Sequence, residues 1–188
     1  MNIPNALTLL RILLIPIFVV VFYLPFRWNH QLACLVFSLA AITDILDGYL
    51  ARKLNQTSSL GAFLDPVADK LMVAVVLVLL VEQDPRPLLA LPAAVIIGRE
   101  ITVSALREWM AELGSRSKVA VSIYGKIKTI TQMVSLILLI YRDPLWILPV
   151  YALGLICLYI AVILTLWSLY EYLASAWIKL KESIRIWL

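Results

Sequence analysis

Long apolar runs separated by short polar breaks make up most of the chain. The expected helices cover residues 1–26, from near Gln31 to about 52, about 60–81, about 87–110, about 122–141 and about 144–170. Only the last holds an uncharged run of the roughly 20 residues needed to cross about 30 Å of hydrocarbon. The others reach that length by including charged residues at one end. We therefore predict six transmembrane helices, followed by an interfacial helix in the tail WIKLKESIRIWL.

Composition agrees with a protein embedded in a membrane. The 188 residues are 63% hydrophobic and 15% charged, and the mean hydropathy is +0.95. Values this apolar are typical of integral membrane proteins. The expected fold is an all-α integral membrane protein in one domain, residues 1–188. The first run lacks a basic leader and a cleavage site, so we expect a retained helix rather than a signal peptide.

The charged ends of the predicted helices fall on one side of the membrane. That side also carries most lysines and arginines, so the positive-inside rule places it in the cytoplasm. We therefore expect a polar active-site cavity that opens to the cytosol. The pI of about 9.1 does not indicate nucleic-acid binding, because the basic residues lie in short loops between apolar runs.

Four aspartates stand out within these apolar helices. Asp44 and Asp47 are three residues apart, and Asp65 and Asp69 are four apart, so each pair lies on one helix face. A turn near residues 53–59 would make the two helices antiparallel and bring the pairs together. Carboxylates in a membrane are costly and mark functional sites. Their mutual repulsion is relieved by an oxygen-loving cation, so we predict a Mg²⁺ or Mn²⁺ site.

Other metal and catalytic chemistries find little support in the sequence. The sole histidine, His30, lies far from the aspartates, which argues against a zinc site or a histidine-based triad. Cys34 and Cys157 lie inside apolar runs without CxxC spacing and are expected to be small core residues.

The aspartates belong to a longer pattern. It reads Asp44-x2-Asp47-Gly48-x2-Ala51-Arg52-x8-Gly61-x3-Asp65-x3-Asp69, and it resembles the full signature of the CDP-alcohol phosphotransferases. The opening NIPNALTLLR, which contains Asn5, the segment GAFLDPVADK and the block GREITVSALREWMAELGSRSKVAVSIYGKIKT resemble the bacterial phosphatidylglycerophosphate synthase group of that family.

This resemblance implies a six-helix homodimer in the bacterial inner membrane. Such an enzyme transfers the phosphatidyl group of CDP-diacylglycerol to glycerol 3-phosphate and releases CMP. The resemblance also implies two divalent cations held by Asp44, Asp47 and Asp65 with a contribution from Asp69, which would act as the catalytic base. Asn5, Gly48, Ala51, Arg52 and Gly61 would contact CDP-diacylglycerol.

A group of basic residues is the candidate site for the phosphate of the acceptor. Its members lie at the mouth of the expected cavity and are Arg99, Arg107, Arg116, Lys126 and Lys128. Each could instead be an ordinary positive-inside charge, but together they match an acceptor that carries its own phosphate.

Three alternatives stay open at this stage. The aspartates could be helix caps and ion-pair partners of Arg52, Lys53 and Lys70. The acceptor alcohol could be inositol phosphate or serine, because either would use the same aspartates. The acidic cluster could also serve a divalent cation transporter, although the charged residues leave no polar path across the outer half of the membrane.

Overall fold

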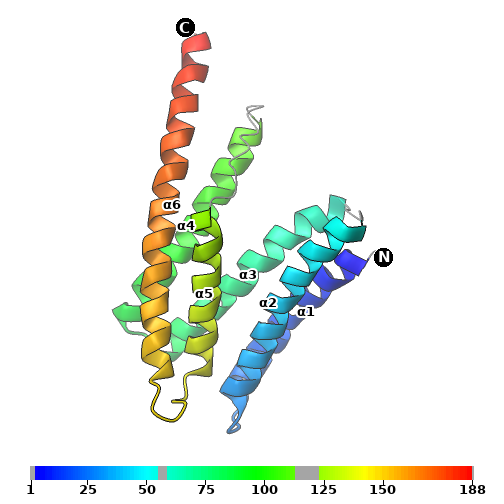
Figure 1. Cartoon of the computed structure of the whole chain (residues 1–188), viewed down its shortest axis with the longest axis vertical. Coiled ribbons are helices and arrows are strands. Elements are labelled where there is room, and N and C mark those ends of the chain that lie inside the picture. Colours follow the sequence, from blue (N-terminus) through cyan, green and yellow to red (C-terminus); the bar gives the residue numbers. More distant parts are fainter. Residues whose placement is uncertain (1–2, 55–58, 113–122, 188) are drawn as a thin grey trace.

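The protein is built from α-helices throughout the part of the chain that the computed structural model describes, residues 3–54, 59–112 and 123–187. Side chains are described in these ranges except at residues 3–4, 47–52, 54, 59–60, 62, 111–112, 123–126, 175–176 and 178–187. The helices are α1 (Ile3–Tyr23), α2 (Asn29–Leu54), α3 (Ser59–Gln83), α4 (Pro87–Glu112), α5 (Ile123–Tyr141) and α6 (Val150–Trp187). The described residues thus form six helices, in the order predicted for the transmembrane helices (Figure 1).

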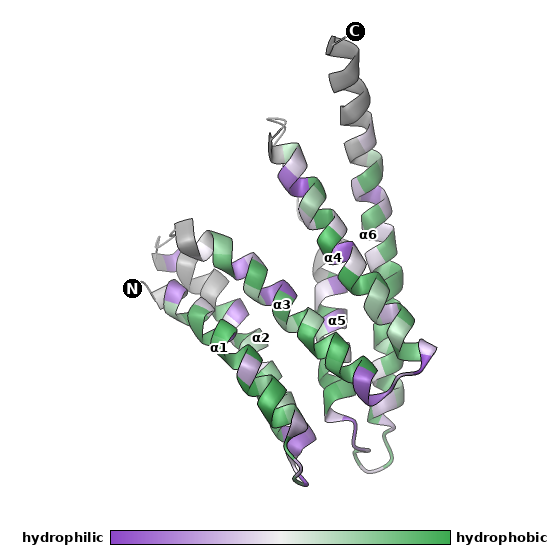
Figure 2. Cartoon of the chain, turned by 180° about the vertical axis from the view of Figure 1, so that it is seen from behind, coloured by the Kyte–Doolittle hydropathy of each residue, from purple (hydrophilic) through white to green (hydrophobic). Residues whose placement is uncertain are grey.

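Four of these helices contain stretches that are long and apolar enough to cross a membrane. They are Asn5–Tyr23 in α1, Asn29–Leu46 in α2, Pro87–Met110 in α4 and Val150–Ala174 in α6. Helix α5 holds a shorter apolar stretch, Ile127–Tyr141. Apolar residues follow most of the helical length, and polar residues lie at the connections and also within α3 and α4 (Figure 2). The chain is therefore a multi-pass membrane protein.

The helices pack as two groups that meet through a shared core. Helix α1 lies against α2 and α3, and α6 lies against α4 and α5. Contacts of α2 with α5 and of α3 with α4 join the groups. The core includes the fully buried side chains of Phe18, Phe37, Leu77, Leu136 and Leu158. Many large apolar side chains stay exposed on the outside, as a surface facing lipid requires.

Helix α6 begins later than the sequence suggested. Its first residue is Val150 rather than Pro144, and residues 142–149 form a loop. A proline disfavours helical geometry in the residue before it, so Pro149 prevents a helix from running through Leu148. Arg142 and Trp146 adopt positive φ angles of 57° and 55°, which a helix does not allow.

The tail WIKLKESIRIWL is not a separate interfacial helix, contrary to the prediction. As far as Trp187 it is the continuation of α6, which is 38 residues long. From Leu155 to Trp187 the sequence contains no glycine or proline. Nothing in the backbone chemistry of this stretch therefore ends the helix at the membrane surface.

Polar contacts join the connections at the end of the bundle away from the aspartates. Arg86 donates two hydrogen bonds of 2.6 Å to the buried carboxylate of Asp84, which also accepts one from the Tyr151 hydroxyl. The Gln31 amide donates to Asp143 over 2.7 Å. The hydrogen bonds from Arg86, and to a smaller extent the one from Tyr151, hold the pKa of Asp84 well below its usual value. The Asp84–Tyr151 contact joins the α3–α4 connection to α6, and the Gln31–Asp143 contact joins α2 to the α5–α6 loop.

Candidate active site

One arginine joins the aspartates of two different helices. Nη1 of Arg11, on α1, lies 2.7 Å from Oδ1 of Asp69 on α3. Nη2 of the same guanidinium lies 3.1 Å from Oδ1 of Asp44 on α2. A buried charge needs such partners, and only 1% of Arg11 is exposed. The two carboxylates therefore converge on one positive group.

A third carboxylate is held by the same face of α1. The hydroxyl of Thr8, three residues before Arg11, donates a hydrogen bond to Oδ1 of Asp65. Residues three or four apart on a helix are neighbours on its surface. The pair Thr8 and Arg11 on α1 therefore faces the pair Asp65 and Asp69 on α3, one contact for each aspartate. One face of α1 therefore contacts Asp44, Asp65 and Asp69, the predicted metal ligands whose side chains are described.

Two of these carboxylates share one positive group and are partly exposed. Asp44 and Asp69 already share one positive group, and 40% and 39% of their side chains are exposed. Their oxygens are therefore accessible from outside, while the arginine behind them is buried. Carboxylate oxygens are the ligands that Mg²⁺ and Mn²⁺ prefer. Within the described side chains, which do not include Asp47, no three acidic, histidine or cysteine residues form a ready-made metal cluster.

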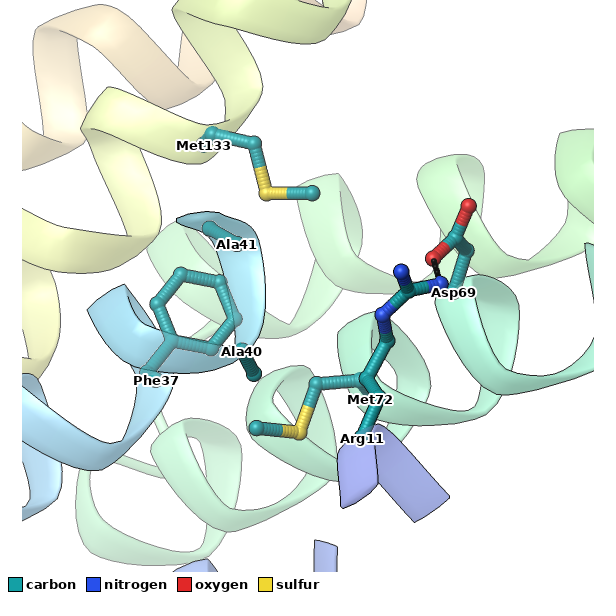
Figure 3. A pocket seen from close by; sticks show the side chains of 7 residues that line it. All are labelled: Arg11, Phe37, Ala40, Ala41, Asp69, Met72 and Met133. Carbon is teal, nitrogen blue, oxygen red and sulfur yellow. Dashed lines mark hydrogen bonds and ion pairs between the residues drawn. The ribbon is translucent and has the colours of Figure 1, made fainter. Parts of the chain in front are cut away.

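A small cavity lies beside the Arg11–Asp69 ion pair. Its volume is about 10 Å³, roughly the space of one water molecule. Figure 3 shows its lining, in which Arg11 and Asp69 meet apolar side chains from α2, α3 and α5. Those apolar residues are Phe37, Ala40, Ala41, Met72 and Met133. This cavity is too small for a nucleotide or a lipid headgroup.

A second polar cluster joins α4 and α5. Glu100 Oε1 lies 3.0 Å from Nη1 of Arg99 and 3.0 Å from Nζ of Lys128. The side chains of both cations are largely buried, with 11% and 5% exposed. Within the described residues, Nε of Arg99 is buried without a hydrogen-bond partner. Two buried cations share one carboxylate here, so the cluster has positive charge to spare for an anion.

Helix α6 completes this basic cluster. The hydroxyl of Ser168 accepts a hydrogen bond of 3.0 Å from Nη2 of Arg99. The hydroxyl of Tyr172, one turn further on, accepts one of 3.0 Å from Nε of Arg107. The Arg107 guanidinium also lies 5.3 Å from the centre of the Tyr172 ring. Three of the predicted phosphate-binding residues, Arg99, Arg107 and Lys128, thus lie in one region.

The acidic and basic clusters are connected through two residues. Lys70, which follows Asp69 on α3, donates a hydrogen bond to the hydroxyl of Ser104 on α4. That hydroxyl donates in turn to the backbone carbonyl of Glu100 over 2.6 Å. This chain of contacts runs from the residue next to the acidic cluster to the backbone of Glu100, whose side chain belongs to the basic cluster. The two clusters are therefore neighbouring parts of one polar region.

The remaining predicted site residues are only partly described. Asn5 lies on α1 and Gly61 is buried on α3. Five others lie on described helices, but their side chains fall outside the described residues. These are Asp47, Gly48, Ala51 and Arg52 on α2 and Lys126 on α5. Arg116 lies wholly outside the described residues.

Sequence reasoning did not assign Thr8, Arg11, Glu100, Ser168 or Tyr172 to the site. For Arg11 a signal existed, because a charged residue in an apolar helix marks a functional position by default. Thr8 and Arg11 also have the spacing of one helix face. For Ser168 and Tyr172 the sequence offers no comparable signal, because hydroxyl side chains are common in transmembrane helices.

Known proteins match this chain along most of its length. Residues 1–167 match the CDP-alcohol phosphatidyltransferase family. The chain is 57% identical to a CDP-diacylglycerol–glycerol-3-phosphate 3-phosphatidyltransferase of Pseudomonas fluorescens, over 98% of this chain and 95% of that protein. It is 55% identical to the protein of the same name from Salmonella paratyphi A, over 93% and 94% of the two chains. The chain therefore belongs to the CDP-alcohol phosphatidyltransferase family.

Proposed function

We propose that the protein transfers the phosphatidyl group of CDP-diacylglycerol to sn-glycerol 3-phosphate, which gives phosphatidylglycerophosphate and CMP. The observation that carries the proposal is the convergence of Asp44 and Asp69, from two helices, on one positive group. Two relatives that match nearly the whole chain are named for this reaction. Neighbouring acidic and basic clusters are what a reaction between a diphosphate and a phosphate-bearing alcohol requires.

The proposal includes a placement in the membrane. One domain, residues 1–188, would cross the bacterial inner membrane six times, with α3 and α5 as the two spans added to the four apolar ones. The polar region would form a cavity open to the cytoplasm. The lysine and arginine bias of the sequence supports this orientation. The protein would act as a homodimer, as its resemblance to the family suggests.

The acidic cluster is the proposed metal site. Asp44, Asp47, Asp65 and Asp69 would hold two Mg²⁺ or Mn²⁺ ions. Bound there, the cations would supply positive charge that neutralises the diphosphate and the departing CMP. Carboxylates that are accessible from outside and already able to share a positive charge support this assignment.

The donor substrate would lie along the polar faces of α2 and α3. Gly48, Ala51 and Gly61 have little or no side chain, so a nucleotide can approach the helix backbones. Arg52 would pair with a phosphate of CDP-diacylglycerol, and Asn5 would contact the same substrate from α1.

The basic cluster would hold the acceptor. Arg99 and Lys128 would bind the phosphate of glycerol 3-phosphate, with help from Arg107, Arg116 and Lys126. Arg99 and Lys128 are buried and share the carboxylate of Glu100, which leaves one net positive charge, and neighbouring Arg107 adds a second. A phosphate dianion would balance the charge of these described residues. Bound in this way, the acceptor would direct its hydroxyl towards the neighbouring acidic cluster.

In the transfer step the acceptor hydroxyl oxygen attacks the phosphorus that carries the diacylglycerol. A new P–O bond forms, the bond from that phosphorus to the bridging oxygen breaks, and CMP leaves with the electron pair. Asp69 accepts the hydroxyl proton. A carboxylate beside positive charge is a weak base, so the proton moves late in the attack.

The test is CMP release by the purified protein with CDP-diacylglycerol, Mg²⁺ and each acceptor in turn. We expect release with glycerol 3-phosphate and little release with serine or inositol phosphate. Faster release with another acceptor would keep the reaction class and overturn the acceptor. Metal-dependent ion flux in liposomes without CMP release would overturn the enzyme assignment in favour of transport.

A further inference from the structure

Helix α1 supplies none of the predicted metal ligands, yet it contacts each predicted ligand whose side chain the structure describes. Thr8 donates to Asp65, and Arg11 pairs with Asp44 and Asp69. We propose that Thr8 and Arg11 are positioning residues, which hold these carboxylates in place before a cation enters. This inference rests on the proposed metal site.

Burial supports a specific role for both side chains. Thr8 and Arg11 are each 1% exposed, in a helix that is otherwise almost entirely apolar. An arginine in such a helix is costly unless its partners compensate it. The partners here are on α2 and α3, so the arrangement also joins three helices around the acidic cluster.

The charges explain why positioning is needed. Carboxylates that converge without a cation repel one another, and flexible side chains would turn apart. The Arg11 guanidinium offsets that repulsion between Asp44 and Asp69, while the Thr8 hydroxyl fixes Asp65 without adding charge. Hydrogen-bond partners behind metal ligands set the ligand orientation, and their loss typically lowers metal affinity roughly 10- to 100-fold.

Thr8→Val gives the sharpest test, because valine keeps the shape and charge but lacks the hydroxyl. The measurement is the dissociation constant of Mn²⁺ alone, from the electron paramagnetic resonance signal of free Mn²⁺ with protein in detergent. We expect about 10-fold weaker binding for Thr8→Val and near-normal binding for Thr8→Ser, which keeps a hydroxyl. Arg11→Lys keeps the charge but cannot bridge two carboxylates, so it should also bind more weakly.

Ser135→Ala is the matched control. Ser135 is fully buried and donates a hydrogen bond of 2.9 Å to the carbonyl of Gly154, between α5 and α6. The control loses a buried hydroxyl of the same kind but should bind Mn²⁺ as the unsubstituted protein does. Helicity and thermal unfolding of each variant show whether the fold is kept.

The outcomes separate this inference from the proposed function. Normal Mn²⁺ binding by folded Thr8→Val, in a protein that releases CMP, would overturn the positioning role and leave the proposed function intact. Equal weakening in Thr8→Val and Ser135→Ala would overturn it as well, because the effect would then be general. An unsubstituted protein that neither binds Mn²⁺ nor releases CMP would overturn the proposed function and the positioning role together.

Discussion

The guanidinium of Arg11 lies 2.7 Å from the carboxylate of Asp69, although 57 residues separate them in the chain. Their side chains differ in exposure, with 2% of Arg11 and 39% of Asp69 exposed. The ion pair therefore has a buried positive side and an accessible negative side. A carboxylate in this position can be held from behind by the protein and still meet a cation or substrate in front.

The first prediction concerns Asp69 as the proton acceptor. Asp69→Asn should lower the rate of CMP release at least ~100-fold, because positioned bases commonly contribute 10²–10⁴-fold. The fold should survive, since Arg11 keeps its contact with Asp44. Helicity and gel filtration check the fold. Asp84→Asn, at the other end of the bundle, is the control and should keep nearly full activity.

The second prediction concerns metal removal. Treatment with a chelator should abolish CMP release, and added Mg²⁺ or Mn²⁺ should restore it, because the acidic cluster would be left without its cations. Asp44→Ala should raise the Mg²⁺ concentration needed for half-maximal activity. Full activity in the chelator after prolonged dialysis would contradict the metal assignment.

The third prediction concerns acceptor binding. Lys128→Met should raise the KM for glycerol 3-phosphate about 10- to 100-fold, which corresponds to the loss of one hydrogen bond to a charged group. The KM for CDP-diacylglycerol should change little. Arg27→Gln removes an exposed charge from the α1–α2 connection and serves as the control. Equal effects on both substrates would argue against an acceptor site in the basic cluster.

The fourth prediction concerns the close approach of α5 and α6. A Cβ atom at Gly154 would lie 2.9 Å from Cγ of Leu139, which is fully buried and has little room to move. Gly154→Ala should therefore lower stability by about 1 to 3 kcal/mol. Gly98→Ala is the matched control, because nothing lies within 4 Å of its added Cβ. It should leave stability unchanged or raise it slightly. Thermal unfolding in detergent measures both.

The fifth prediction concerns pH. Asp84 has a depressed pKa, so the stability it contributes is present above the ordinary aspartate pKa of about 3.9 and is lost as the pH falls through its lower folded value. Asp84→Asn should therefore lower stability by about 1 kcal/mol, equally at pH 5 and pH 8. Below pH 4 the difference in melting temperature should shrink. A difference that already disappears between pH 8 and pH 5 would contradict the assignment.

The sequence by itself determined which segments become helices, and it predicted which residues carry the chemistry. Apolar runs of sufficient length must be helical in a membrane, because lipid offers no partners for the backbone. The four aspartates are conspicuous for the same reason, since a carboxylate is costly there. These properties depend on composition and local spacing, so the order of the helices and the family resemblance followed without coordinates.

Only the tertiary structure decided which side chains meet. The pairing of Thr8 and Arg11 with aspartates on α2 and α3 depends on how three helices pack, and no local pattern encodes it. The same holds for Ser168, which reaches Arg99 from a helix 69 residues further along the chain. The continuous α6 was misjudged because the sequence shows where polar residues begin, whereas a helix ends only where its backbone geometry is interrupted. Hydropathy is a property of each residue, so it can be read from the sequence. Contacts between helices depend on how the helices pack in three dimensions.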